Sequence, residues 1–380
     1  MDNRIRKNCR IERKPNMVLE AVGLLLQLKS STGYAQLQKD IARKYGFSTP
    51  AMEAKFDLLC RIEADARSRI EEIQENLDLY FSGGAPENTT IGEVVLLWWD
   101  TNLRTSESLS EYRKRLSSLS ETEWCKKYSN ALGVYLDGTL KDSDYVEYET
   151  MIEVIQYILH MDVPDEQKLM YQSILVEREV HWDRLFAMLE WATEILKSYR
   201  DEMTAIAEEC ADYYTQLFEK ITVEEYIEES IGFTLRENAL GSVMTPYFTH
   251  PNMFNMMADG KEVITSPYYV IMGVLFDEDF ELKLKNGQKE EPDQEYIEKV
   301  LKLLGDKSKF AILTYIKDKR AYGSELAKQL NLTTATISHH MGALFSAGLI
   351  TAEEEDNRVY YRGNTEAIRY VLEQCEKALT

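Results

Sequence analysis

The chain has 380 residues, which is longer than one ordinary domain. Apolar residues make up 44% and aromatic residues 11% of the sequence, and this content is too high for a disordered protein. The formal net charge is -21, from 44 basic and 65 acidic residues. Residues 295–380 contain 12 basic and 12 acidic residues, so the whole acidic excess precedes them. The acidic part should repel a phosphate backbone, and any contact with nucleic acid is therefore expected within residues 295–380.

The N-terminus carries basic residues up to position 14 but shows no targeting or membrane signal. The apolar stretch that follows, Met17–Lys29, is too short to span a bilayer and is interrupted by Glu20 and Gln27. We expect residues 1–15 to form a solvated terminus in preference to an arm that grasps DNA. The five cysteines are far apart in sequence, which is typical of a reducing compartment, and we expect a cytoplasmic protein without membrane contact.

Helical patterns dominate residues 1–229. The segment Met17–Lys29 is apolar nearly all round and is expected to be a buried helix. Further helical periodicity covers Tyr34–Tyr45, Ala51–Phe81 and Leu109–Leu136. This part of the chain is therefore predicted to be a helical domain.

The most apolar nonamer of the chain is Ile91–Trp99, which ends in the pair Trp98 and Trp99. Two adjacent indoles could line a ligand pocket, because aromatic rings offer a large contact area. Such a pair is more often part of the core, and both interpretations are kept.

Residues 165–221 contain no Gly or Pro, and apolar side chains recur in alternating steps of three and four from Trp182 to Leu217. This pattern predicts one long heptad-patterned helix, which would extend for roughly 85 Å at 1.5 Å per residue. Its seam could join two subunits into a symmetric dimer. Consecutive helices that pack on the rest of the same chain would explain the pattern equally well.

The composition changes over residues 230–283. Strands are expected at Gly241–Phe248 and Glu262–Phe276, which are rich in Val, Ile, Thr, Tyr and Phe. His250 has no second His or Cys at ligand spacing, so we expect a structural histidine there. Residues 284–294 are polar and include Gly and Pro, which indicates a linker to a separate domain over 295–380.

A helix-turn-helix is predicted over Gly323–Ile350. Apolar residues recur at helical spacing up to Leu330 and again from Ile337, with a short interruption between the two segments. Thr333 is placed to cap the second helix with its hydroxyl group. The outward face of that helix then carries small hydrogen-bonding side chains, Thr334, Thr336, Ser338 and His339. Such a face suits the edges of base pairs in a major groove.

Two short strands are predicted after this helix, on either side of the turn Asp356–Asn357. The order of helix, turn, helix and hairpin is that of a winged helix-turn-helix. The block Thr-Ile-Ser-His-His-Met-Gly-Ala-Leu-Phe-Ser-Ala-Gly-Leu-Ile, residues 336–350, and the wing Asp-Asn-Arg-Val-Tyr-Tyr-Arg, residues 356–362, resemble the arsenical-repressor (ArsR) type of bacterial transcription regulator. By this resemblance the first block is the recognition helix, and His339 is the histidine that faces the DNA.

The candidate DNA-contacting residues are Thr333, Thr334, Thr336, Ser338, His339 and Arg358. Arg358 lies at the wing tip, where an arginine can enter a narrow minor groove. Possible phosphate contacts are Lys307, Lys309, Lys319 and Arg320, although a solvated basic surface explains each of them as well. The acidic run from Glu353 to Asp356 is unfavourable so close to DNA. Many members of the family that the chain resembles sense metals, but Glu325–Lys328 stands where their thiolate pair would be, so we expect no metal.

The sequence thus predicts a mainly α protein: a large helical N-terminal domain with a small β region, followed by a winged helix-turn-helix. We expect a homodimeric regulator that binds a double-stranded DNA operator, with no cofactor and no catalytic site, because no nucleotide-binding, zinc-protease or nucleophile-elbow motif is present. The N-terminal domain would sense an unknown signal, such as a small-molecule effector. Two alternatives are kept: a catalytic N-terminal domain with a regulatory winged helix, and a scaffold whose winged helix binds protein.

Overall fold

The computed structural model describes residues 9–45, 48–82, 90–96, 108–133, 136, 147–231, 233–234, 241–257, 267–277, 294–355 and 358–379. The chain forms two compact units. The first comprises residues 1–137, 146–220 and 238–280, and the second comprises 138–145, 221–237 and 281–380. The chain therefore enters the second unit three times and returns to the first unit twice.

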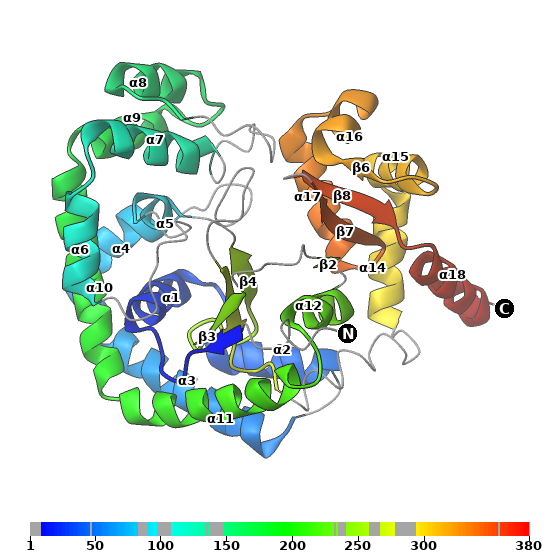
Figure 1. The fold of residues 1–380 in the computed structure, drawn as a ribbon, viewed down its shortest axis with the longest axis horizontal. Coiled ribbons are helices and arrows are strands. Elements are labelled where there is room, and N and C mark those ends of the chain that lie inside the picture. The colour runs from blue at the N-terminus through cyan, green and yellow to red at the C-terminus, as the bar shows by residue number, and fades with distance from the viewer. Residues whose placement is uncertain are drawn as a thin grey trace. The chain divides into compact units, whose positions relative to one another are not determined.

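The first unit is mainly helical (Figure 1). Its helices are α1 (Met17–Lys29), α2 (Tyr34–Tyr45), α3 (Pro50–Ser68), α4 (Gln74–Phe81), α5 (Ile91–Val95), α6 (Leu109–Ser117), α7 (Glu121–Leu132), α8 (Met151–His160), α9 (Asp165–Val176), α10 (Arg178–Lys197) and α11 (Arg200–Phe218), with the 3-10 turn Ile70–Glu72 between α3 and α4. The apolar helix α1 lies at the centre, against α3, α4 and α10. Its buried position confirms what its all-round hydrophobicity predicted.

A four-stranded sheet completes this unit. Its strands are β1 (Cys9–Ile11), β3 (Ser242–Tyr247), β4 (Phe254–Met257) and β5 (Tyr268–Gly273), in the order β1-β3-β5-β4. β3 is parallel to β1 and to β5, and only β4 runs antiparallel. Helix α11 packs against β1 and β3. The strands β3, β4 and β5 thus share one compact unit with the helices, and residues 9–11, predicted to lie in a solvated terminus, pair with β3.

The single long helix predicted over residues 165–221 is wrong, because the structure has three helices there, α9, α10 and α11. The chain leaves the helical conformation at Glu177, with φ -109° and ψ 37°, and at Tyr199, with φ -110° and ψ 2°. Side chains along the heptad pattern, including Trp182, Leu189 and Met203, are buried within one chain. The apolar periodicity therefore reflects packing inside the unit, as the second interpretation of the pattern held.

The second unit contains a winged helix-turn-helix. Its elements are α12 (Val223–Ile231), β2 (Phe233–Thr234), α14 (Gln294–Gly305), α15 (Lys307–Ile316), β6 (Ala321–Tyr322), α16 (Gly323–Leu330), α17 (Thr334–Ser346), β7 (Ile350–Glu355), β8 (Arg358–Gly363) and α18 (Thr365–Leu379). A core of Ile312, Leu326, Ile337, Leu344 and other buried residues holds α14 to α18 together. The predicted fold class, mainly α with a C-terminal winged helix-turn-helix, is confirmed.

The wing sheet has an additional strand that the sequence pattern did not predict. Its order is β2-β7-β8-β6, and β7 and β8 form the predicted hairpin. β2 runs parallel to β7, with Phe233 opposite Ala352 and Thr234 opposite Glu353. One edge of the wing is therefore covered by a segment that lies about 120 residues earlier in the chain.

None of the helices in the described ranges is long and apolar enough to cross a membrane.

Candidate nucleic-acid interface

The turn between α16 and α17 is built by two residues with distinct backbone roles. Asn331 ends α16 in the left-handed conformation, with φ 54°, which asparagine tolerates better than most residues. The Thr333 hydroxyl accepts a hydrogen bond of 3.1 Å from the backbone N–H of Thr336 and so caps α17. The predicted cap is confirmed, and it fixes where the second helix begins.

The two faces of α17 differ as a groove-reading helix requires. Ile337, Met341 and Leu344 are buried in the core of the unit. Ser338 and Gly342, four residues apart, are exposed on the other side. Apart from the two neighbouring residues and the backbone of α17 itself, no atom of the described residues lies within 4 Å of the position that a Cβ of Gly342 would occupy. The described positions of the outer face therefore carry small groups, which allow close approach to the floor of a major groove.

The two adjacent histidines of α17 have different surroundings. His340 is half-buried. The pKa of Asp306, the N-cap of α15, is lowered mainly by a hydrogen bond from the backbone N–H of Lys309, and the charges of Lys309 and His340 add to this effect. His340 thus belongs to the inner packing of the unit. The side chains of His339 and Thr334, both candidate DNA contacts, lie outside the described residues.

One residue of the acidic run Glu353 to Asp356 in the wing forms an ion pair with a basic residue. Arg320 lies 3.4 Å from the carboxylate of Glu353, and its guanidinium stacks over the ring of Tyr360 at 4.7 Å. One charge of the acidic run is thereby neutralised. Arg358 begins β8 opposite Glu355, beside the hairpin tip, but its side chain is outside the described residues, as is the turn Asp356–Asn357.

The four basic candidates for phosphate contact are not equivalent. Lys309 is only 11% exposed and lies 3.5 Å from Asp306. Arg320 is engaged with Glu353, as described above. Lys307 and Lys319 are exposed, and the ammonium group of Lys319 sits 3.5 Å from the ring centroid of Tyr315. Lys307 and Lys319 are therefore the better placed of the four to meet a phosphate.

A buried hydrogen-bond chain in the first unit has the residue types of a nucleophile and its base, although the sequence patterns did not single it out. The Ser173 hydroxyl lies 3.0 Å from His181 Nε2, and the Tyr80 hydroxyl lies 2.6 Å from His181 Nδ1. Burial raises the pKa of Tyr80, and Arg184 opposes this effect. Both ring nitrogens of His181 therefore have a hydrogen-bond partner, and the direction of each bond depends on the tautomer. The chain joins α4, α9 and α10 inside the unit, which is a role in packing.

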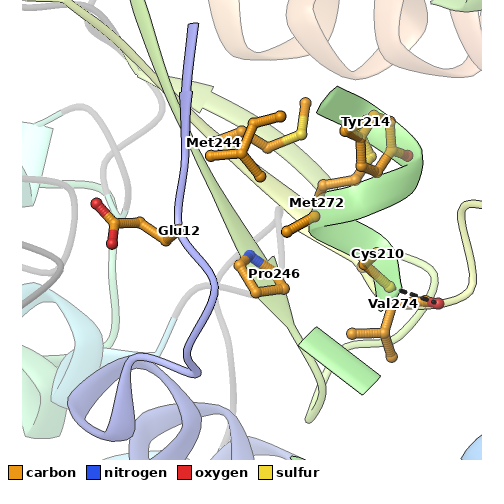
Figure 2. Close-up of a pocket in the computed structure, with 10 residues that line it drawn as sticks. Glu12, Cys210, Tyr214, Met244, Pro246, Met272 and Val274 are labelled. Atoms are coloured by element: carbon orange, nitrogen blue, oxygen red, sulfur yellow. Dashed lines mark hydrogen bonds between the residues drawn. The ribbon is translucent and has the colours of Figure 1, made fainter. Parts of the chain in front are cut away.

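A small cavity lies between α11 and the sheet of the first unit. Cys210, Tyr214, Met244 and Met272 are among its lining residues, and Figure 2 shows the Glu12 carboxylate pointing away from them. The enclosed space has room for only about one water molecule. It is too small for an effector in this conformation. Trp98 and Trp99, the predicted pocket residues, lie outside the described residues.

Residues 306–352 match the family model described as bacterial regulatory protein, arsR family. This match covers the helix-turn-helix and the first three residues of β7, and well under half of the chain. Neither the curated proteins nor the solved structures contain a significant match to the chain. The C-terminal unit is therefore an ArsR-type winged helix-turn-helix, a domain of DNA-binding transcription regulators, in a chain with a long N-terminal extension.

Proposed function

We propose that the protein is a sequence-specific transcription regulator that reads a double-stranded operator with α17. The observation that carries the proposal is the division of α17 into a buried apolar face and an exposed face of small groups, fixed in place by the Thr333 cap. The proposed base contacts are Thr333, Thr334, Thr336, Ser338 and His339, with Arg358 in the adjacent minor groove. Hydroxyl and imidazole groups at these positions can donate to or accept from base edges.

A homodimer is the proposed binding form. The module has no net positive charge, so a single copy should bind DNA weakly, and two linked copies would reach a useful specific affinity. Exposed apolar side chains support this proposal, namely Leu301 on α14 and Leu372 on α18, two helices that pack against each other. Each is about half exposed, and burial against a second copy would remove both from water.

The proposed role of the N-terminal unit is to sense a signal and pass it to the wing. The route we favour is β2, because this strand pairs with β7 while the residues before 221 and after 237 belong to the first unit. A ligand that prefers one arrangement of the first unit would then bias the position of the wing, and with it operator affinity.

A band-shift titration tests the proposal. A selection from a random duplex library with the wild-type protein supplies the operator, and the variant Thr336→Ala/His339→Ala is then titrated against it. Loss of two base contacts should weaken specific binding by about 1–3 kcal/mol per contact while leaving non-specific binding in place. The matched control is Thr314→Ala/His160→Ala, which removes the same two side-chain types at exposed positions on α15 and α8. Equal operator affinity of the test variant and the control would refute the assignment.

A further inference from the structure

Exposed apolar side chains gather on one part of the first unit. Among the described residues, nine large apolar side chains are exposed, and five of them fall between residues 152 and 180. These five are Ile152 and Leu159 on α8, Leu169 and Val176 on α9, and Val180 in the first turn of α10, and they are here called the α8–α9 surface. Ile152 is 70% exposed and Leu169 is 66% exposed, so these side chains contribute little to the core. Such a concentration of exposed apolar side chains is typical of an interaction site.

The positions on α8 and α9 follow the period of a helix face. Ile152 and Leu159 are seven residues apart on α8, and Leu169 and Val176 are seven residues apart on α9. The opposite sides of both helices are already buried, through Val154 and Ile158 on α8 and through Tyr171, Ile174 and Leu175 on α9. The two helices pack side by side (Figure 1), and the Lys168 ammonium group on α9 donates to the Leu159 carbonyl oxygen at the end of α8. Each helix therefore presents a second apolar stripe, which stays exposed in the part of the chain that the structure describes.

The charge around these stripes is negative. Residues 151–180 contain six acidic and two basic residues. The acidic residues Asp162, Asp165, Glu166 and Glu177 are exposed beside the apolar positions. Both basic residues are engaged: Lys168 bonds Leu159, while Arg178 donates to the Leu119 carbonyl oxygen and stacks over the ring of Trp182.

We propose that the α8–α9 surface binds a basic amphipathic helix of a partner protein. Apolar side chains at i, i+3 or i+4 and i+7 on such a helix would cover the stripes, and flanking Lys or Arg would meet the acidic rim. A second copy of this chain is a poorer occupant, because two acidic rims would face each other. An anionic membrane would repel the rim for the same reason.

A fluorescent synthetic peptide tests the proposal with the full chain. The probe is an 18-residue helix-forming peptide with leucine along one face and lysine along the other, and fluorescence anisotropy measures its Kd. Two comparison peptides are used: one with glutamate in place of lysine, and one with the same composition in scrambled order. We expect the amphipathic lysine peptide to bind at least about tenfold more tightly than either.

Substitutions locate the binding. Leu159→Ser/Leu169→Ser should weaken peptide binding by about tenfold or more, whereas Leu79→Ser, at an exposed leucine on α4, should leave it unchanged. Asp165→Lys/Glu166→Lys should weaken binding of the lysine peptide and strengthen binding of the glutamate peptide. Circular dichroism checks that all variants keep the helical content of the wild type, as expected for substitutions of exposed side chains.

Equal binding of the lysine peptide to all variants would overturn the proposal, because it would show non-specific attraction to an acidic protein. Sedimentation velocity tests whether a second copy of the chain occupies the surface instead. A wild-type dimer that is lost in Leu159→Ser/Leu169→Ser would show this and would also overturn the proposal.

Discussion

Glu20 gives the most quantitative prediction, because it is a fully buried acidic residue in the first turn of α1. Its oxygens accept hydrogen bonds from the backbone N–H groups of Phe248, at 3.0 Å, and Thr249, at 2.9 Å, and from the Thr249 hydroxyl, at 2.9 Å. Burial outweighs these bonds and raises the pKa of Glu20 to about 7. The carboxyl group is thus half-protonated near neutral pH in the folded state, while in the unfolded chain it is ionised above about pH 4.5.

The sign of the stability effect follows from this difference. The folded state binds the extra proton between about pH 4.5 and 7, so the contribution of Glu20 to stability is fully present below pH 4.5 and is lost as pH rises through 7. A pKa difference of this size corresponds to about 3 kcal/mol at most. Glu20→Gln removes the titration but keeps an amide oxygen that can accept from both backbone N–H groups. We therefore expect the free energy of unfolding of the variant, relative to that of the wild type, to increase by up to about 3 kcal/mol as pH rises from 5 to 8.

Urea denaturation at pH 5, 6, 7 and 8, followed by tryptophan fluorescence, measures this gain, since all five tryptophans belong to the first unit. Tyr34 and Tyr247, which lie beside Glu20, have pKa values raised well above the ordinary one by burial, so neither ionises in this range. Glu177→Gln removes an exposed carboxylate of the same unit and serves as the control. A difference between Glu20→Gln and wild type that stays constant across the four pH values would refute the reasoning.

Four further outcomes are expected from single substitutions. Thr333→Ala removes the cap of α17 and should lower the free energy of unfolding by about 1 kcal/mol in urea titrations, with weaker operator binding in band shifts. Gly342→Leu enters open space on α17, so stability should rise by about 0.5–1 kcal/mol while operator affinity falls by tenfold or more; a variant that binds as tightly as wild type would show that this face does not approach DNA. Gly23→Ala would place a methyl group against the Thr249 hydroxyl, and we expect a net loss of about 1–2 kcal/mol by thermal denaturation, opposite in sign to the usual gain for Gly→Ala in a helix. Lys319→Ala should lower the magnitude of the slope of log K against log salt by about 0.9, whereas a side chain that meets no phosphate would leave the slope unchanged.

The helix-turn-helix could be predicted from the sequence because its determinants are local. The apolar spacing, the Thr333 hydroxyl and the turn residues each act within four residues of the structure that they specify. The matching positions of α1 and α2 follow from the same kind of signal. The division of α17 into two faces was likewise readable from its residues, whereas the engagement of Arg320 with Glu353 was not, because it joins positions 33 residues apart.

The long helix could not be predicted correctly, because the heptad pattern from Trp182 to Leu217 continues across the break at Tyr199, and neither this break nor the one at Glu177 carries Gly or Pro. Packing of α10 against α1 and its neighbours decides the conformation there, and this contribution is not encoded in the local sequence. β1 and β2 were missed for a related reason. Each has three residues or fewer and forms only by pairing with a distant strand.

The strand β2 changes how this regulator can be engineered. A fragment cut at the polar stretch 284–294 would keep every helix of the ArsR-type module yet leave β7 with an open edge, inviting the aggregation that unpaired strands promote. A chimaera that contained only this module would also have an unpaired edge at β7, unless residues 221–237 were transferred together with the module. The winged helix-turn-helix of this protein is formed by two separate segments of the chain, and the C-terminal segment alone is not a complete domain.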